Sequence, residues 1–157
     1  MKKSLFLLLF LISAFGTAYS QSAELKDALK EVNTTFKEYK YVSEDVDIHE
    51  VTGKTTDIVV SLKNGELVFN ITDDYGDFSD PFYGFRHGVI TVSVPVKEAC
   101  FDSTAHALLI TSKSPNGVLL VYDGKKELLK SYSICGTEGN IIKLRKELEK
   151  LLSLANR

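Results

Sequence analysis

The feature that most constrains the fold is a change in the spacing of apolar residues along the chain. Apolar residues recur every three or four positions over residues 22–39, and again over residues 140–154. Between these segments, over residues 42–134, apolar and polar residues largely alternate. The wider spacing predicts amphipathic helices, and alternation predicts strands with one buried face. The sequence therefore predicts an α+β fold, in which an antiparallel sheet or roll of about seven strands lies between an N-terminal and a C-terminal amphipathic helix.

Turn residues between the alternating segments favour antiparallel pairing. Asn64-Gly65 and Asp123-Gly124 tolerate positive φ at both central positions, which suits a two-residue hairpin. Ser114-Pro115-Asn116-Gly117 has Pro and Gly where a type I turn favours them, and predicts a third hairpin. We expect strands near residues 42–51, 56–63, 66–72, 89–96, 106–111, 118–122 and 127–134.

The first twenty residues have the features of a signal peptide. Lys2 and Lys3 precede an unbroken apolar run over residues 5–12, and Ala18-Tyr19-Ser20 offers small residues where a signal peptidase cuts. The run is shorter than the roughly 20 residues that span a bilayer. We expect a signal peptide over residues 1–20 and a single α+β domain over residues 21–157. The product would be periplasmic or secreted, without a membrane span in the mature protein.

Charge and composition narrow the classes of partner. The chain has 19 Lys and Arg against 21 Asp and Glu, and 44% of its residues are hydrophobic, which is typical of a globular domain. Removal of Lys2 and Lys3 raises the excess of acidic residues from two to four. An acidic surface is not drawn to nucleic acid by its overall field, so no nucleic-acid partner is expected.

The two cysteines, Cys100 and Cys135, both lie in the part expected after cleavage. An even number of cysteines in a chain sent to an oxidising compartment predicts a disulfide between them. Two alternatives stay open. The cysteines could be buried free thiols, or Cys100 could be catalytic with the nearby His106.

Two resemblances follow from these features. The Met1-Lys2-Lys3 start, the Ser20-Gln21 junction and the size resemble those of small exported proteins of Bacteroidetes-type bacteria. Seven short antiparallel strands and a final helix over residues 42–154 resemble the pleckstrin-homology-like roll, with an additional N-terminal helix. Neither resemblance assigns an activity to particular residues. A cystatin-like or other helix-on-sheet arrangement stays open.

Short catalytic and metal-binding motifs are missing from the sequence. It contains no HExxH, GxSxG, P-loop, CxxC or dinucleotide fingerprint. His49, His87 and His106 have no recognised metal spacing. The acidic run that begins at Asp73 departs from the calcium-loop pattern, because its third position is Tyr75. We therefore assign no catalytic residue and expect neither a metal nor a cofactor.

The segment over residues 73–88 is the candidate binding site. It has no clear period over sixteen residues, and structureless segments of this length are uncommon unless they are functional or disordered. Its five aromatic residues either pack beneath the segment or form a contact surface, and aromatic residues beside an arginine are typical of contact hot spots. The candidate contact residues are Tyr75, Phe82, Tyr83, Arg86 and His87.

Three functions are compatible with these observations. The first choice is an exported, non-enzymatic binding or protein-interaction domain, whose partner is an unknown protein or small ligand. One alternative is a small secreted hydrolase that uses His87, His106 and the acids of residues 73–80. Another is an inhibitor or immunity-type protein that occupies the active site of an enzyme through residues 73–88.

Overall fold

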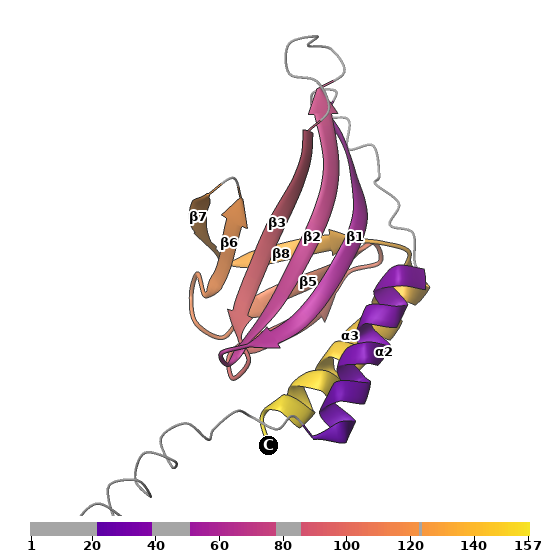
Figure 1. The fold of residues 1–157 in the computed structure, drawn as a ribbon, viewed down its shortest axis with the longest axis vertical. Helices are drawn as coiled ribbons and strands as arrows, with labels where there is room; N and C mark the ends of the chain where they lie inside the picture. The colour runs from indigo at the N-terminus through magenta and orange to yellow at the C-terminus, as the bar shows by residue number, and fades with distance from the viewer. Residues whose placement is uncertain (1–21, 39–50, 78–85, 123) are drawn as a thin grey trace, which may run out of the picture.

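The computed structural model describes residues 22–38, 51–77, 86–122 and 124–157, and for residues 51–56, 73–77 and 86–87 it describes the backbone alone. In this part of the chain, two helices and eight strands form an α+β fold (Figure 1). The elements are α2 (Ala23–Glu38), β1 (Val51–Lys63), β2 (Glu66–Asp77), β3 (Arg86–Pro95), β4 (Ala99–Ser103), β5 (Ala107–Ser112), β6 (Val118–Tyr122), β7 (Lys125–Leu129), β8 (Ser131–Cys135) and α3 (Glu138–Ala155). The predicted fold class is confirmed.

The strands form two antiparallel sheets. Sheet A has the order β1-β2-β3-β6-β7, and sheet B has the order β4-β5-β8. Figure 1 shows β1, β2 and β3 as long curved strands, with β5 and β8 running across them. The curvature carries one end of β1–β3 well beyond the helices. This end of sheet A, formed by residues 51–55, 73–77 and 86–88, is called the far end below.

Two of the three predicted hairpins are confirmed. Asn64 and Gly65 have φ values of 53° and 80° and join β1 to β2. Gly124, with φ of 73°, lies in the turn between β6 and β7. The Ser114–Gly117 turn also forms, with Gly117 N–H donating to Ser114 C=O at 3.2 Å. It joins β5 of sheet B to β6 of sheet A, so the prediction of a hairpin there is wrong.

The strand count also differs from the prediction. The chain forms β4, which the sequence did not predict. The strand has only five residues, and its two buried apolar residues, Ala99 and Phe101, are too few to show a clear alternation. Residues 127–134 were expected to form one strand, but they divide between β7 of sheet A and β8 of sheet B, with Lys130 at the division. Residues 42–50, expected to begin a strand, lie outside the described residues. The point at which a chain passes from one sheet to another cannot be detected from apolar periodicity, because apolar and polar residues alternate in the strands before and after that point.

The two helices pack against each other in opposite directions. Ser22 begins α2, and its hydroxyl accepts a hydrogen bond from Leu25 N–H at 3.2 Å, as an N-cap does. Three ion pairs join the helices: Glu24–Arg157 at 3.9 Å, Glu31–Lys150 at 2.7 Å and Glu38–Lys143 at 4.0 Å. Their order along the helices shows the antiparallel arrangement. Helix α2 packs on β1, and α3 packs on β4 and β5.

One aromatic residue joins the layers of the core. Phe69 on β2 has no exposed surface and meets Phe36 of α2 and Phe101 of β4. Both ring pairs are edge-to-face, with centroids 6.5 Å apart, which is a favourable arrangement for aromatic rings. Sheet A, sheet B and α2 therefore share one continuous core.

The predicted disulfide is not formed, and the two cysteines are free thiols. Cys100 lies on β4 opposite Thr111 of β5, whereas Cys135 lies on β8 opposite Ala107 of β5. Strands β4 and β8 flank β5, so they are separated by about 10 Å, twice the usual strand spacing. A disulfide requires Cα atoms within about 7 Å. The prediction is therefore wrong, because the spacing of cysteines in a sequence carries no information about which strands separate them.

We expect Phe69→Ala to lower the free energy of unfolding by about 3–5 kcal/mol, since it removes the ring that contacts both Phe36 and Phe101. Val89→Ala is the control, because Val89 on the same sheet is 55% exposed, and it should change the free energy by less than about 0.5 kcal/mol. Urea unfolding followed by circular dichroism measures both values. Equal losses in the two variants would contradict this description of the core.

Candidate functional site

The candidate contact residues from the sequence lie partly at the far end of sheet A. Tyr75 of β2 is paired with Arg86 of β3, and His87 of β3 is paired with Asp74 of β2. The backbone thus brings Tyr75, Arg86 and His87 together at one end of the sheet. Phe82 and Tyr83 lie outside the described residues, so their part in a site stays a prediction.

The segment over residues 73–88, expected to be irregular, is a strand at both of its ends. Residues 73–77 continue β2, and residues 86–88 begin β3. Asp73 is paired with Gly88 on one side and with Thr55 of β1 on the other. Pairing on both sides of β2 extends the strand through aspartates, which are uncommon in strands, because tertiary context outweighs intrinsic propensity. The prediction of a loop over residues 73–88 is therefore wrong for these two ends.

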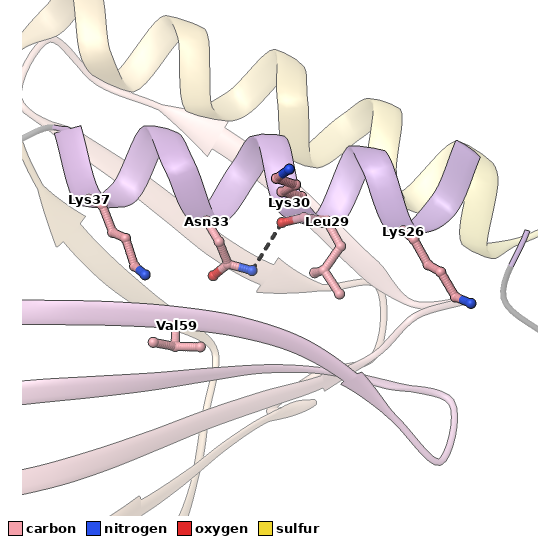
Figure 2. Close-up of a pocket in the computed structure, with 6 residues that line it drawn as sticks. All are labelled: Lys26, Leu29, Lys30, Asn33, Lys37 and Val59. Carbon is pink, nitrogen blue, oxygen red and sulfur yellow. Dashed lines mark hydrogen bonds between the residues drawn. The ribbon is translucent and has the colours of Figure 1, made fainter. Parts of the chain in front are cut away.

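A groove lies between α2 and β1, away from the predicted segment. Its volume is about 390 Å³, and Figure 2 shows Lys26 and Lys37 reaching from α2 toward β1 at its two ends. Leu29 of α2 and Val59 of β1 form an apolar floor between them, and Val59 is 40% exposed. Lys30 also lines the groove but is turned away from the strands (Figure 2).

Asn33 fixes the centre of the groove. Its side-chain carbonyl accepts a hydrogen bond from Val60 N–H at 2.7 Å, and its amide donates to Val60 C=O at 2.9 Å. The same amide donates to Leu29 C=O at 3.0 Å, within α2. Because β1 is the edge strand of sheet A among the described strands, these backbone groups have no neighbouring strand on that side in this part of the chain. Asn33 takes the place of a strand partner and holds α2 at a fixed position along β1.

The lysines of the groove have no counter-charge in the described part of the chain. Among the residues that the structure describes, no carboxylate lies within 4.0 Å of Lys26, Lys30 or Lys37. In contrast, the seam between α2 and α3 pairs each of its long cations with an acid, as at Lys150–Glu31. Like charges at i and i+4, such as Lys26 and Lys30, destabilise a helix by about 0.2–0.5 kcal/mol. The groove therefore concentrates unneutralised positive charge beside an apolar surface.

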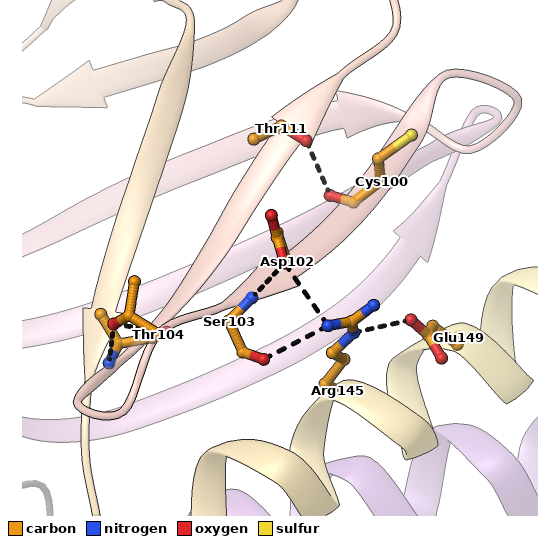
Figure 3. Close-up of polar contacts among 8 residues, drawn as sticks. Cys100, Asp102, Ser103, Thr104, Thr111, Arg145 and Glu149 are labelled. Atoms are coloured by element: carbon orange, nitrogen blue, oxygen red, sulfur yellow. Dashed lines mark hydrogen bonds and ion pairs between the residues drawn. The ribbon is translucent and has the colours of Figure 1, made fainter. Parts of the chain in front are cut away.

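A polar cluster joins α3 to β4 (Figure 3). Arg145 donates to Glu149 at 2.9 Å and to the Ser103 hydroxyl at 3.3 Å, and it lies 3.4 Å from the carboxylate of Asp102. The hydrogen bond to Glu149 is the main cause that raises the pKa of Arg145 above its ordinary value. The acids already neutralise this guanidinium, so the cluster is a link between helix and sheet, in contrast to the groove.

A second polar contact lies in the seam between the helices. The Thr35 hydroxyl donates to Glu147 at 3.0 Å, and both residues are more than nine-tenths buried. The second carboxylate oxygen of Glu147 has no hydrogen-bond partner in the described part of the chain. Lys143 lies 3.8 Å from the first oxygen and balances the charge. The contact fixes the register of α2 against α3.

The histidines proposed for a hydrolase are divided between the two sheets. His87 belongs to β3 of sheet A, whereas His106 is exposed at the turn that precedes β5 of sheet B. His106 N–H donates to the Thr104 hydroxyl at 3.3 Å. His49 lies outside the described residues. Among the residues that the structure describes, no three His, Cys, Asp or Glu side chains are grouped as metal ligands.

Neither helix in the described part has the length and apolar character required to cross a membrane.

No protein-family model, curated protein sequence or solved structure matches the chain. The resemblances to a pleckstrin-homology-like roll and to exported proteins of Bacteroidetes-type bacteria therefore stay predictions.

Sequence reasoning missed the groove between α2 and β1. Lys26, Lys30 and Lys37 lie outside the apolar stripe of the first helix, but any exposed helix face has such residues. Asn33 attracts attention in the sequence only as the start of an Asn33-Thr34-Thr35 glycosylation motif. The signal that was available is the recurrence of polar residues at positions 26, 30, 33 and 37, which marks one narrow stripe of a helix.

We expect Asn33→Ala to lower the free energy of unfolding by about 1–3 kcal/mol, because Val60 loses both hydrogen bonds on its open side. Hydrogen exchange should show faster exchange at the Val60 amide. Asn33→Asp keeps the acceptor for that amide, so its free energy of unfolding should decrease less than that of Asn33→Ala. Thr34→Ala is the neighbouring control, and its Val60 amide should keep normal protection. Unchanged protection in Asn33→Ala would contradict the assigned role.

Proposed function

We propose that this protein is an exported, non-enzymatic binding domain that holds an anionic, partly apolar ligand in the groove between α2 and β1. The observation that carries the proposal is the set of ammonium groups of Lys26, Lys30 and Lys37 around the floor of Leu29 and Val59, which no acid of the described residues neutralises. An anion neutralises the charge that the chain leaves open, while the apolar part of the ligand covers the floor. These two interactions are typical of a small-ligand site with few polar anchors.

The groove is suited to binding because its walls are fixed and its charges are movable. Asn33 anchors α2 to the Val60 backbone, and Phe36 anchors the same helix to the core. Lys26 and Lys37 are exposed and have long flexible stems, so they can follow an anion without a change in the fold. Since the charges are exposed to water, the affinity should decrease as salt increases.

A second contact surface for a protein partner is proposed at the far end of sheet A. The pairing of β2 with β3 places the sequence-based candidates Tyr75 and Arg86 opposite each other there, on one face of the sheet, with His87 at the adjacent position on the other face. Aromatic residues beside an arginine are favoured at protein contacts, which supports this surface. It lies on the same sheet as the groove, and one partner could use both.

Export is the second part of the proposal. The positive start, apolar run and small residues before position 21 support it, and Ser22, the N-cap of α2, would remain after cleavage. We expect protein purified from the producing cell to begin at Gln21, either free or cyclised. Mass spectrometry of the N-terminal peptide measures this. Intact Met1 in the exported fraction would contradict export through this segment.

The groove is tested with anilinonaphthalene sulfonate, an anion with an apolar ring system. We expect it to shift backbone amide signals of α2 and β1 in nuclear magnetic resonance spectra of residues 21–157. Its single sulfonate pairs with one lysine at a time, so in Lys26→Gln/Lys37→Gln its affinity should fall up to about fivefold, as expected for the loss of one partly screened ion pair. Lys146→Gln removes an exposed lysine of α3 outside the groove, and it should bind normally.

Two outcomes would contradict the groove as the site. One is equal binding by the double lysine variant and by Lys146→Gln. The other is a set of shifted signals confined to the far ends of β2 and β3, which would transfer the site to that surface.

A further inference from the structure

We propose that the ligand of the α2–β1 groove is an extended acidic peptide segment of another protein, with two carboxylates about six residues apart on one face and apolar residues between them. This inference rests on the proposed function of the same groove. It adds the chemical class of the ligand and the spacing of its charges.

The spacing follows from the positions of the two end lysines. Lys26 and Lys37 are eleven positions apart on α2, which corresponds to about 16 Å along the helix axis at a rise of 1.5 Å per residue. Eleven positions also complete just over three whole turns, so both side chains leave the same face. An extended peptide advances about 3.3 Å per residue, and its successive side chains point to opposite faces, so two carboxylates on one face are an even number of residues apart. Six residues cover about 20 Å, and the flexible stems of the two lysines span the difference from the spacing on the helix. One carboxylate at each end of such a segment can reach one ammonium group.

The number of charges favours a peptide over a simple lipid anion. A fatty acid carries a single carboxylate, so it would neutralise one lysine and leave the other at the far end unpaired. The apolar floor consists of Leu29 and Val59, one residue from each wall, and matches one or two apolar side chains. A peptide supplies carboxylates at both ends and side chains of that size between them.

The edge of β1 decides how the peptide lies. Val60 already has its N–H and C=O bonded to Asn33 in the middle of the groove, so a continuous ladder of hydrogen bonds with a new strand is blocked there. The peptide must therefore bind through its side chains. Lysines beside an edge strand also disfavour pairing with a purely apolar strand. An acidic segment is the kind of extended chain that this edge accepts.

The test uses a fluorescein-labelled heptapeptide, Asp-Ser-Val-Ser-Leu-Ser-Asp, whose acidic and apolar side chains share one face when it is extended, and fluorescence anisotropy with the mature chain. The matched peptide has both aspartates replaced by asparagine, and a third peptide has its aspartates three positions apart. We expect the first peptide to bind about tenfold tighter than its asparagine counterpart, which forms neither ion pair, and about threefold tighter than the third peptide, whose carboxylates reach only one lysine at a time. Its affinity should fall in Lys26→Gln/Lys37→Gln, remain in Lys146→Gln and decrease with added salt.

The outcomes separate this inference from the proposed function. If anilinonaphthalene sulfonate binds in the groove but the acidic peptide binds no better than its asparagine counterpart, the inference is overturned and the binding groove stands. If dodecanoate binds tighter than the peptide with the same dependence on Lys26 and Lys37, the ligand is a lipid anion and the inference is again overturned. If neither probe binds, both proposals are wrong.

Discussion

The arrangement of the whole domain depends on the contact of Phe69 with Phe36 and Phe101. These three rings come from sheet A, α2 and sheet B, and together they fix the distance and rotation of the helix against the strands. With Phe36 directed at the core, Asn33 lies one turn earlier on a neighbouring face of the helix, directed at the edge of β1. The position of the groove is thus a consequence of how the core packs.

Placing α2 beside an edge strand has a further consequence. A long edge exposes unpaired backbone groups that attract other strands, and β1 has thirteen residues. Asn33 satisfies the Val60 groups, and Lys26 and Lys37 surround this point with positive charge. The same features that protect the edge from indiscriminate pairing make it selective for an anionic ligand. Protection of the edge and binding can therefore be two properties of one structure.

The contrast between the two sides of α2 supports the interpretation of the groove as a site for an anionic ligand. On the side that faces α3, acids and bases alternate across the seam, and Thr35 meets Glu147 in a buried contact. On the side that faces β1, the charges all have one sign and no partner in the described residues. Neutralised charges hold the helices in register, whereas unneutralised charges remain available to a ligand.

The sequence by itself determined the secondary structure classes, because apolar periodicity reports local geometry. Both helices, the antiparallel pairing and the Asn64-Gly65 turn could be predicted in this way. Only the tertiary structure decided that Asp73 belongs to a strand, that β5 separates Cys100 from Cys135, and that Asn33 reaches Val60. Each of these depends on contacts between residues far apart in the chain, and periodicity within a short segment carries no record of which segments become neighbours.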